Sequence, residues 1–532
     1  MNFRQRFCYT FFSFLLTACQ GVNSQQRLHP LPQDSLVQVY FNHTESSQYQ
    51  ETLRQQQRNG DNLEQQIVEA ISASKSSVVL AVQELRLPKI AQALVERQKA
   101  GVKVRVILEN TYNRPWSESK PGKSPREVLR YNELRQLADV DRDGQISADE
   151  VRKEDAVLIL RSAKVPVIDD TADGSKGSNL MHHKFVIIDD RIVIVTSANF
   201  TSSDIHGDIT NPQSTGNANN LVQIDSPQLA ALFTQEFNLM WGDGSKKSEY
   251  LFGLKKPFRP AQQVQVGNTT IDVQFSPTSP TLPWSQSTNG LIAQTINTSN
   301  QSVDLALFVF SDQGIANILE QQSNHNVQIR AVIEPDFIYR PYSEALDMMG
   351  VSLSNKCKYE PQNHPWANPI TTVGVPQLLK GDLLHHKFAV VDKSAVITGS
   401  HNWSEAANSS NDETLLVIHS PTVAAHYQQE FERLYAHAQL GLPERVHQKI
   451  QSAQKQCSKL QVAPPPNELQ QLVNLNTASL AQLIALPGVG EKLAQRIIQA
   501  RQQKPFTSFA DLDRVPGFGA NLLQKLKSRV TF

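Results

Sequence analysis

Two kinds of hydrophobic pattern follow one another along the first part of the chain. Short apolar runs predict strands at residues 36–41, 77–85 and 102–109, and the segments between them predict helices at 62–74 and 90–100. Strands that alternate with helices favour an α/β fold, in which parallel sheets carry helices on their outer faces.

The same order of elements returns in the second part of the chain. Strands are predicted at 271–275, 302–310 and 327–334, and helices at 290–299 and 314–323. The repetition of the whole plan indicates an internal duplication.

Local sequence matches support this duplication. Glu109 corresponds to Glu334, and SPQLAALFTQEF at 226–237 parallels SPTVAAHYQQEF at 420–431. Each of these two segments begins with a serine suited to an N-cap and a proline at the first helical position. We therefore expect two α/β halves that pair about a pseudo-twofold axis around one cleft, at residues 34–245 and 262–440.

One pattern of polar residues occurs once in each half. LMHHKFVIIDDRIVIVTSANF at 180–200 matches LLHHKFAVVDKSAVITGSHNW at 383–403. Residues two apart on a strand share a face, so each copy directs an imidazole, an ammonium, a hydroxyl and an amide towards one place. The candidate residues are His182, Lys184, Asp189, Ser197 and Asn199 in the first half, and His385, Lys387, Asp392, Ser400 and Asn402 in the second.

This set of side chains suits a phosphodiester. Lysine and asparagine donors can hold the non-bridging oxygens where charge develops, and a histidine can attack phosphorus or transfer a proton. A single His-x-Lys would be weak evidence, because isolated histidines in strands mostly serve packing or lie on the surface. Two copies with the same continuation favour catalysis.

The pattern resembles the signature of the phospholipase D superfamily, HxKxxxxD, which is present twice. Gly399, Ser400 and Asn402 match the glycine-serine-x-asparagine continuation of that family, whereas Thr196 replaces the glycine in the first copy. The resemblance implies one active site shared by two α/β halves, and we expect no cofactor there.

The family also places an acidic residue downstream of each motif. Glu413 fits this position in the second half, but its counterpart in the first half is Asn219. Asp204 and Asp208 are alternative sources of a carboxylate in the first half, and the spacing does not decide between them.

These residues suggest a mechanism with a phosphohistidine intermediate. We expect His182 to attack phosphorus and His385 to protonate the leaving oxygen, after which water activated by His385, or an alcohol, releases the product. Glu413 is expected to orient an imidazole across the cleft, which favours His182 as the nucleophile. Asp189 and Asp392 fall on the opposite strand face and are expected to be supportive.

The first half contains an extra segment, DVDRDGQISADE, that matches a calcium-binding EF-hand loop. Oxygen ligands at the required offsets, with Gly144 at the sharp turn, suit Ca²⁺, and both flanking segments can be helical. No second loop is visible, so we expect a structural clamp or an affinity modifier; an acidic surface turn without an ion is the alternative. The expected ligands are Asp139, Asp141, Asp143, Gln145, Ser147 and Glu150.

Charge and composition limit the partners of the chain as a whole. Its 532 residues include 51 lysines and arginines and 51 aspartates and glutamates, so the formal net charge is zero. A chain of this length can form more than one domain. Any surface for nucleic acid must be local, because the overall charge attracts no polyanion.

The N-terminus has the pattern of an export signal. Arg4 and Arg6 precede an apolar run that is too short to span a bilayer permanently. The segment at 16–19 resembles a bacterial lipobox, which implies removal of residues 1–18 and lipidation of Cys19. We expect an exported protein that is lipid-anchored to a bacterial membrane, and the following glutamine resembles an outer-membrane sorting signal. An ordinary signal peptide, giving a secreted protein, or a buried N-terminal helix is the alternative.

Two cysteines remain in the mature chain, Cys357 and Cys457. Export permits a disulfide between them, and two free thiols are the alternative.

A small module follows the second half. The helix that contains Phe431 is expected to continue to about Cys457, and a helical and Pro-rich linker is placed at 441–466. Residues 467–532 repeat a helix, turn and helix twice, with turns LPGVG and VPGFG. This tail resembles the paired helix-hairpin-helix module of bacterial competence-type DNA receptors.

Glycines at these turns let backbone N–H groups approach phosphate, which binds the DNA backbone without reading bases. Use of the hairpins for protein contacts is the alternative. The expected DNA-binding residues are Gly488, Gly490, Lys492, Gly517, Gly519 and Lys525.

Three functions are consistent with this organisation. The first is an exported non-specific nuclease whose tail binds DNA; the second is a phospholipase D that hydrolyses phosphatidylcholine-type lipids beside its membrane anchor; the third is a DNA-uptake protein without catalysis. The intact motif pairs argue against the third, and the tail favours the first. Because both halves lie in one chain, we expect an active monomer.

Overall fold

The computed structural model describes most of the chain outside its N-terminus and one linker. The described residues are 28–457, except 52, 53, 243–248 and 361, and 473–531, except 485, 487, 488, 519–521, 523–525 and 527–529. The predictions for residues 1–18, Cys19, Gly488, Gly519 and Lys525 lie outside them. No helix within these ranges has the length and apolar character needed to cross a bilayer.

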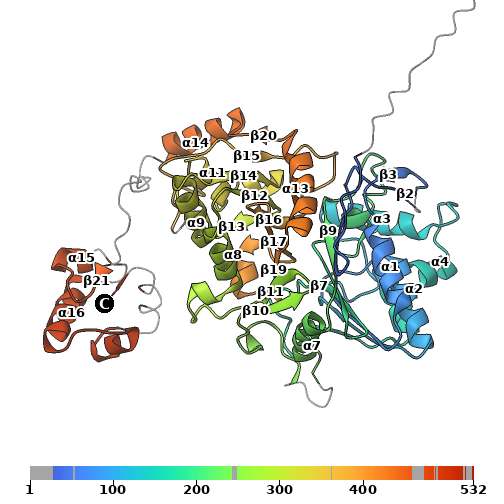
Figure 1. Ribbon diagram of the computed structural model, residues 1–532, viewed down its shortest axis with the longest axis horizontal. Coiled ribbons are helices and arrows are strands. Elements are labelled where there is room, and N and C mark those ends of the chain that lie inside the picture. Colours follow the sequence, from blue (N-terminus) through green and yellow to red (C-terminus); the bar gives the residue numbers. More distant parts are fainter. Residues whose placement is uncertain are drawn as a thin grey trace, which may run out of the picture.

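A seven-stranded sheet forms the centre of the first half (Figure 1). Its strand order is β1 (Val37–Phe41), β9 (Asn220–Asp225), β8 (Ile192–Thr196), β7 (Lys184–Ile188), β4 (Ser77–Val82), β5 (Lys103–Leu108) and β6 (Val167–Asp169).

The second half repeats this sheet and extends it at both edges. Its strand order is β10 (Gln262–Val266), β11 (Thr269–Phe275), β19 (Thr414–His419), β17 (Ala395–Gly399), β16 (Lys387–Val391), β12 (Ser302–Leu307), β14 (Gln328–Ile333), β15 (Val373–Val375) and β20 (Gln439–Leu440).

Both sheets are mixed, so the prediction of parallel sheets is wrong in part. Within these two sheets only β4, β5 and β6, and likewise β12, β14 and β15, run parallel to one another. The motif strands form hairpins instead. β7 turns directly into β8 through Asp189 and Asp190, both at positive φ, and two strands joined by so short a turn must be antiparallel.

Helices cover the outer face of each sheet, as predicted. Apolar side chains of α1 (Leu63–Ala73), α2 (Pro88–Lys99) and α5 (Ala156–Ser162) pack on β4 and β5. In the second half α8 (Thr288–Asn297) and α9 (Gln313–Asn324) take the corresponding places on β12 and β14.

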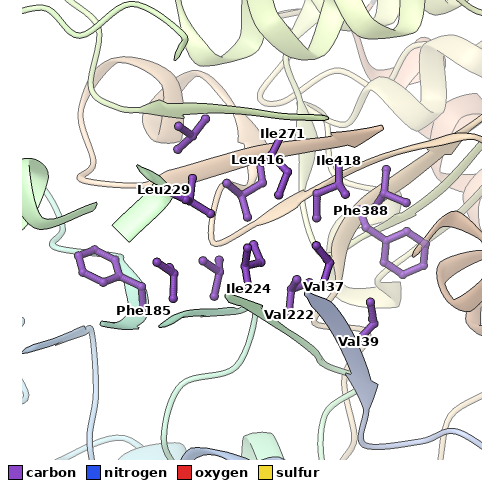
Figure 2. Close-up of a cluster of buried hydrophobic side chains, with 14 of the residues drawn as sticks. Val37, Val39, Phe185, Val222, Ile224, Leu229, Ile271, Phe388, Leu416 and Ile418 are labelled. Atoms are coloured by element: carbon purple, nitrogen blue, oxygen red, sulfur yellow. The ribbon is translucent and has the colours of Figure 1, made fainter. Parts of the chain in front are cut away.

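The inner faces of the two sheets share one hydrophobic core. Figure 2 shows Val37, Val222 and Ile224 of the first half facing Leu416 and Ile418 of the second. The core is completed by α7 (Pro227–Trp241) and α13 (Pro421–Tyr435), whose predicted serine N-caps are confirmed. Each half therefore buries apolar surface that it would expose alone.

The helix predicted to run from Phe431 to Cys457 is interrupted. α13 ends at Tyr435, β20 adds an edge strand, and α14 spans Glu444–Gln456. Gly441, at φ 79°, and Pro443, the N-cap of α14, explain the break. Cys457, at the end of α14, forms a disulfide with Cys357, with a Cα–Cα distance of 5.5 Å.

The extra segment of the first half folds as two helices around a loop, as predicted. α3 (Pro125–Ala138) enters the loop and α4 (Ala148–Glu154) leaves it, and each begins with a capping box. In the tail, α15 (Leu480–Ile484), α16 (Glu491–Gln503), β21 (Val473–Asn474) and β22 (Val530–Thr531) surround a small core of their own.

Short elements complete the two halves. They are β2 (Gln48–Gln50), β3 (Gln57–Asn59), α6 (Ser202–Ile205), β13 (Phe310–Ser311), α10 (Pro335–Ile338), α11 (Glu344–Met348), β18 (Trp403–Ser404) and α12 (Glu405–Ser409).

Candidate active site

The two motif histidines lie immediately before their strands and are tied to the opposite half. The backbone N–H of His182 donates to the carbonyl oxygen of Asp412 at 2.9 Å, and that of His385 donates to Ala218 at 3.1 Å. Each segment thus crosses the pseudo-twofold axis. The structure brings both His-x-Lys pairs together, which is the arrangement that one shared site requires.

Each imidazole also finds a side-chain partner across the axis, but the two partners differ. His182 Nδ1 lies 2.6 Å from Glu413 Oε2, whereas His385 Nδ1 lies 3.0 Å from Asn219 Oδ1. The two histidines are therefore not electrostatically equivalent, because one faces a carboxylate and the other a neutral amide.

The amide of Asn219 is oriented by its own neighbours. Its Nδ2 donates to the carbonyl oxygens of Asp204 at 2.9 Å and Asn217 at 3.2 Å, so Oδ1 is the atom that faces His385. Since Oδ1 only accepts, His385 Nδ1 carries the proton. In the neutral ring, Nε2 then presents a lone pair.

Asp204 rather than Asp208 lies beside this histidine. Asp204 Oδ1 is 3.9 Å from His385 Nδ1, and Asp204 Oδ2 accepts from the backbone N–H of Asn199 at 2.7 Å. Burial raises the pKa of Asp204. The first half thus keeps a carboxyl group near the imidazole without a direct hydrogen bond to it.

The motif serines hold the partners of the histidines. Ser400 Oγ donates to Glu413 Oε2 at 2.7 Å, and Ser197 Oγ donates to Asn219 Oδ1 at the same distance. Both serines act through another side chain, so they position the site.

Both motif lysines are fully buried. Lys184 Nζ donates to the carbonyl oxygen of His182 at 3.0 Å, and Lys387 Nζ donates to that of His385 at 2.7 Å. Burial lowers the pKa of Lys184 to about 8. Burial, and then the charge of Lys184, lower the pKa of Lys387. A phosphate anion at this point would compensate two positive charges that have little access to water.

The same environment keeps the imidazoles neutral. Burial is the main cause that lowers the pKa of His182 and of His385, and the two lysines add to it. A bound phosphate would oppose this shift, because an anion stabilises imidazolium.

The motif asparagines have unused hydrogen-bonding capacity. Asn199 Oδ1 and Asn402 Oδ1 are buried and, among the described residues, have no partner. Since buried polar groups are normally paired, each Oδ1 can accept a hydrogen bond, and the Nδ2 of the same amide is the atom that can donate to a phosphate oxygen.

Asp189 and Asp392 do not belong to the reacting group, which corrects their inclusion with the catalytic set. Asp189, beyond the far end of β7, accepts hydrogen bonds from the backbone N–H groups of Lys75, Ser76 and Ser77. Asp392 does the same for residues 300–302 before β12. Each aspartate therefore anchors the loop that leads into a central strand of its own half, β4 for Asp189 and β12 for Asp392.

A second pair of histidines, which was not predicted from the sequence, lies next to the motif histidines. His183 Nε2 lies 3.3 Å from Glu236 on α7, and His386 Nε2 lies 2.9 Å from Glu430 on α13. The signal was present, because both motifs read His-His-Lys and both matched helices carry the glutamate.

Lys256 extends this network in the first half. It pairs with Glu236 and lies 2.6 Å from Asp412, whose carbonyl oxygen holds His182. A residue in the connector between the halves thus supports the backbone of the motif.

The acidic loop brings three carboxylates together. One oxygen each of Asp139, Asp141 and Asp143 lies within 4.8 Å of the other two. Asp139 Oδ1 is buried without a partner among the described residues, which fits a cation, and Gly144 makes the turn at φ 80°. Glu150, however, is engaged with the N–H of Val140 and with Ser147 in the capping box.

The described part of the tail places one turn glycine, Gly490, at a helix start. Gly490 is the N-cap of α16, Lys492 is exposed in its first turn, and Gly517 adopts φ 109°. Arg496 Nη1 donates to the carbonyl oxygen of Pro516 at 2.8 Å, which ties the second turn to α16.

Two α/β halves with two interlocked His-x-Lys pairs define a phosphodiesterase. The chain belongs to the PLD-like family: the family model described as "Cardiolipin synthase, PLD-like domain" matches residues 67–241 and 292–435. A second model, the helix-hairpin-helix motif, matches residues 469–531. The protein is accordingly a hydrolase of phosphoric diester bonds.

Curated relatives match parts of the chain. A mitochondrial cardiolipin hydrolase of Xenopus laevis is 28% identical over 186 residues, which is 34% of this chain and 78% of the relative. The protein of the same name from Xenopus tropicalis is 28% identical over 139 residues, 26% of this chain and 56% of the relative. The match thus spans little more than half of the second relative. A solved phosphatidylserine synthase of Haemophilus influenzae is 12% identical, with a TM-score of 0.48 over 81% of this chain and 93% of that one.

Proposed function

We propose that the protein is an exported, membrane-tethered nuclease that cleaves polynucleotides through a phosphohistidine. The observation that supports a polynucleotide is the helix-hairpin-helix match at residues 469–531, joined to a phosphodiesterase core. A tethered DNA-binding module raises the local concentration of substrate at the site. Since its contacts go to the phosphate backbone, cleavage would be non-specific in sequence.

In the first step, His182 Nε2 attacks phosphorus and the bond from phosphorus to the leaving oxygen breaks. His385, protonated when the substrate anion is bound, transfers its Nε2 proton to that oxygen. The assignment of His182 rests on the 2.6 Å contact with Glu413, because the imidazole gains positive charge as the P–N bond forms. The amide of Asn219 offers His385 no such compensation.

In the second step, neutral His385 takes a proton from water, and the resulting hydroxide attacks phosphorus. The P–N bond breaks and returns neutral His182. Lys184, Lys387 and the two motif asparagines hold the non-bridging oxygens throughout. Trapping the labelled intermediate should place the phosphoryl group on His182, and a label on His385 would reverse the assignment.

A substrate panel tests the nuclease proposal. The mature protein is incubated in EDTA with plasmid DNA, RNA, phosphatidylcholine vesicles and cardiolipin vesicles. Cleavage of DNA is expected, with at least a thousandfold loss in His182→Ala and in His385→Ala. Cleavage of lipid without cleavage of nucleic acid would refute it.

The alternative is a phospholipase, and it is favoured by the relatives that are named cardiolipin hydrolases. A lipid anchor at Cys19 would place such an enzyme beside its substrate. The disulfide between Cys357 and Cys457 supports export under either proposal, since such bonds persist in oxidising compartments. Replacement of Cys19 by alanine should release the protein from the membrane fraction.

We further propose that the acidic loop binds Ca²⁺ as a structural clamp. The three converging aspartates support this, with Gln145, Ser147 and Glu150 completing the set once Glu150 turns from its cap towards the ion. Calcium at a hundred times its Kd should stabilise the metal-stripped protein by about 2.7 kcal/mol in thermal unfolding. No change in the melting temperature, or the same change in Asp139→Asn, would count against the site.

A further inference from the structure

The two halves also differ in the residues that follow β4 and β12, which lie beside the site at what we call the mouth of the cleft. Residues 83 and 84, after β4, are Gln83 and Glu84; the corresponding residues after β12 are Phe308 and Val309. The Phe308 ring lies 4.8 Å from the ring of His385. The mouth therefore has a charged side on the first half and an aromatic side on the second.

The charged side is built around one carboxylate and two guanidinium groups. Glu84 is buried and accepts from Arg86 Nε at 3.0 Å and also from Arg130 Nη2. Two guanidinium groups share this carboxylate, so Glu84 alone does not neutralise both. Arg86 is occupied further by the carbonyl oxygen of Arg114, at 2.8 Å.

Arg130 is the guanidinium with donors to spare. Its side chain is 45% exposed, and Nη2 is the nitrogen that has a hydrogen-bond partner in the described part of the chain. Its guanidinium lies 5.7 Å from the centre of the Tyr112 ring, which limits its rotation. An arginine held at one end and open at the other is suited to bind an anion.

Arg130 is close to the reacting groups. Glu84 directly follows Gln83, whose Oε1 accepts from Lys184 Nζ at 3.3 Å. The charges of Glu84 and, more weakly, of Asp204 raise the pKa of Arg130, and Asp204 itself lies beside His385. The arginine therefore faces the site from a neighbouring position without being part of it.

The helix that carries Arg130 is fixed along the mouth. One turn further on, Glu133 accepts from Thr210 Oγ1 at 2.9 Å. Thr210 belongs to the loop that reaches the second half, where Asp382 accepts from Ser214 and Thr215. α3 thus spans from the end of β4 to the contact between the halves.

We propose that Arg130 binds a second phosphate of the substrate, one nucleotide away from the scissile diester. The inference rests on the proposed nuclease function and sharpens it. A polynucleotide has a phosphate at every nucleotide, whereas phosphatidylcholine has a single phosphate group. Cardiolipin has two phosphates, so the distinction from that lipid comes from the nucleotide esters and the substrate panel. Through Arg130, helix α3 would thereby raise kcat/KM for polynucleotides above that for substrates with a single phosphodiester.

The test uses chromogenic esters that differ by one phosphate. Thymidine 5′-(4-nitrophenyl phosphate) is compared with the same ester bearing a 3′-phosphate. Thymidine 3′-(4-nitrophenyl phosphate) is likewise compared with the same ester bearing a 5′-phosphate. In the wild-type protein the additional phosphate should raise kcat/KM about tenfold in one of the pairs. In Arg130→Gln this advantage should disappear.

Arg135→Gln is the matched control. It makes the same change on the same helix at an exposed arginine, and the tenfold advantage should persist. An Arg130→Gln variant that loses activity equally on all four esters would show a structural role and overturn the proposal. So would an unchanged advantage, or no advantage in the wild type.

Failure of the inference is separable from failure of the proposed function. If plasmid DNA is cleaved and Arg130→Gln keeps the advantage, only the second-phosphate site is wrong. If lipid is cleaved and no nucleic acid is, both proposals are wrong.

Discussion

The contrast between Glu413 and Asn219 is the main chemical difference between two otherwise matching sets of side chains. Both residues occupy the same place in their half and contact the imidazole of the other half. The carboxylate stabilises a positively charged ring, and the amide fixes the tautomer of a neutral one. These two contacts therefore favour different roles for the histidines, with His182 as the nucleophile and His385 as the proton donor.

Glu413→Gln tests this assignment. The rate constant of phosphoenzyme formation, measured by stopped flow, should fall about a hundredfold or more. The reason is that the positive charge on the His182 ring is no longer compensated by a carboxylate. Asn219→Asp should cost less than tenfold and should raise the pH at which activity falls on the alkaline side, since a carboxylate raises the pKa of His385. Equal losses in the two variants would contradict unequal roles.

Some of these residues could be foreseen and others could not. The resemblance to the phospholipase D superfamily, which places an acidic residue downstream of the motif, identified Glu413 as a residue that orients an imidazole across the cleft. The role of Asn219 as an oriented acceptor was missed, because it depends on hydrogen bonds to Asp204 and Asn217 that no spacing reveals. Arg130 gave no signal, because its partner Glu84 lies 46 residues away.

At the scale of elements, the turn between β7 and β8 is expected to contribute to stability through one of its two aspartates. Asp189 and Asp190 both lie at positive φ in the turn between β7 and β8, but only Asp189 accepts backbone hydrogen bonds from residues 75–77.

Asp189→Ala should therefore lower the free energy of unfolding by about 2–3 kcal/mol, since several hydrogen bonds to a charged group are lost. Asp190→Ala provides the control, because the two positions share the strain of alanine at positive φ. Urea unfolding measures both. Equal destabilisation would show that the anchoring bonds add nothing, and unchanged kcat in folded Asp189→Ala is expected in either case.

The order of strands and helices was predicted correctly in both halves, but strand direction was predicted correctly only for the parallel strands of each sheet, β4, β5 and β6, and β12, β14 and β15. Apolar periodicity reports which residues are buried and is blind to whether neighbouring strands run parallel or antiparallel. Likewise, the break between α13 and α14 depended on Gly441 and Pro443, whose local geometry outweighed the helical spacing around them.

At the scale of the whole molecule, many histidines are buried in neutral form. Burial lowers the pKa of His43 to about 3 and that of His401 to about 4, and it lowers the pKa of both motif histidines. In the unfolded chain all of them titrate near 6.5.

Each buried neutral histidine should consequently lower the free energy of unfolding as the pH falls below about 6.5. Between that value and its lowered folded pKa, the unfolded chain binds more protons, so each such histidine removes up to about 1.4 kcal/mol per pH unit. Buried carboxyls act in the opposite direction, because burial raises the pKa of Glu334 to about 7 and also raises that of Glu413, so the test compares variants. Urea unfolding from pH 7.5 to 5 measures the slope of stability against pH. In His43→Gln the slope should be smaller by about one proton than in the wild type, and an unchanged slope would contradict a neutral buried His43.

The shared hydrophobic core has one more consequence. Two identical subunits around a twofold axis must give both imidazoles the same neighbour, so any substitution beside one changes the other as well. Fusion of the copies into a single polypeptide removes that constraint while the common interior keeps them in register. Glutamate on one side and asparagine on the other is a division of labour that only an asymmetric descendant of a symmetric pair can evolve.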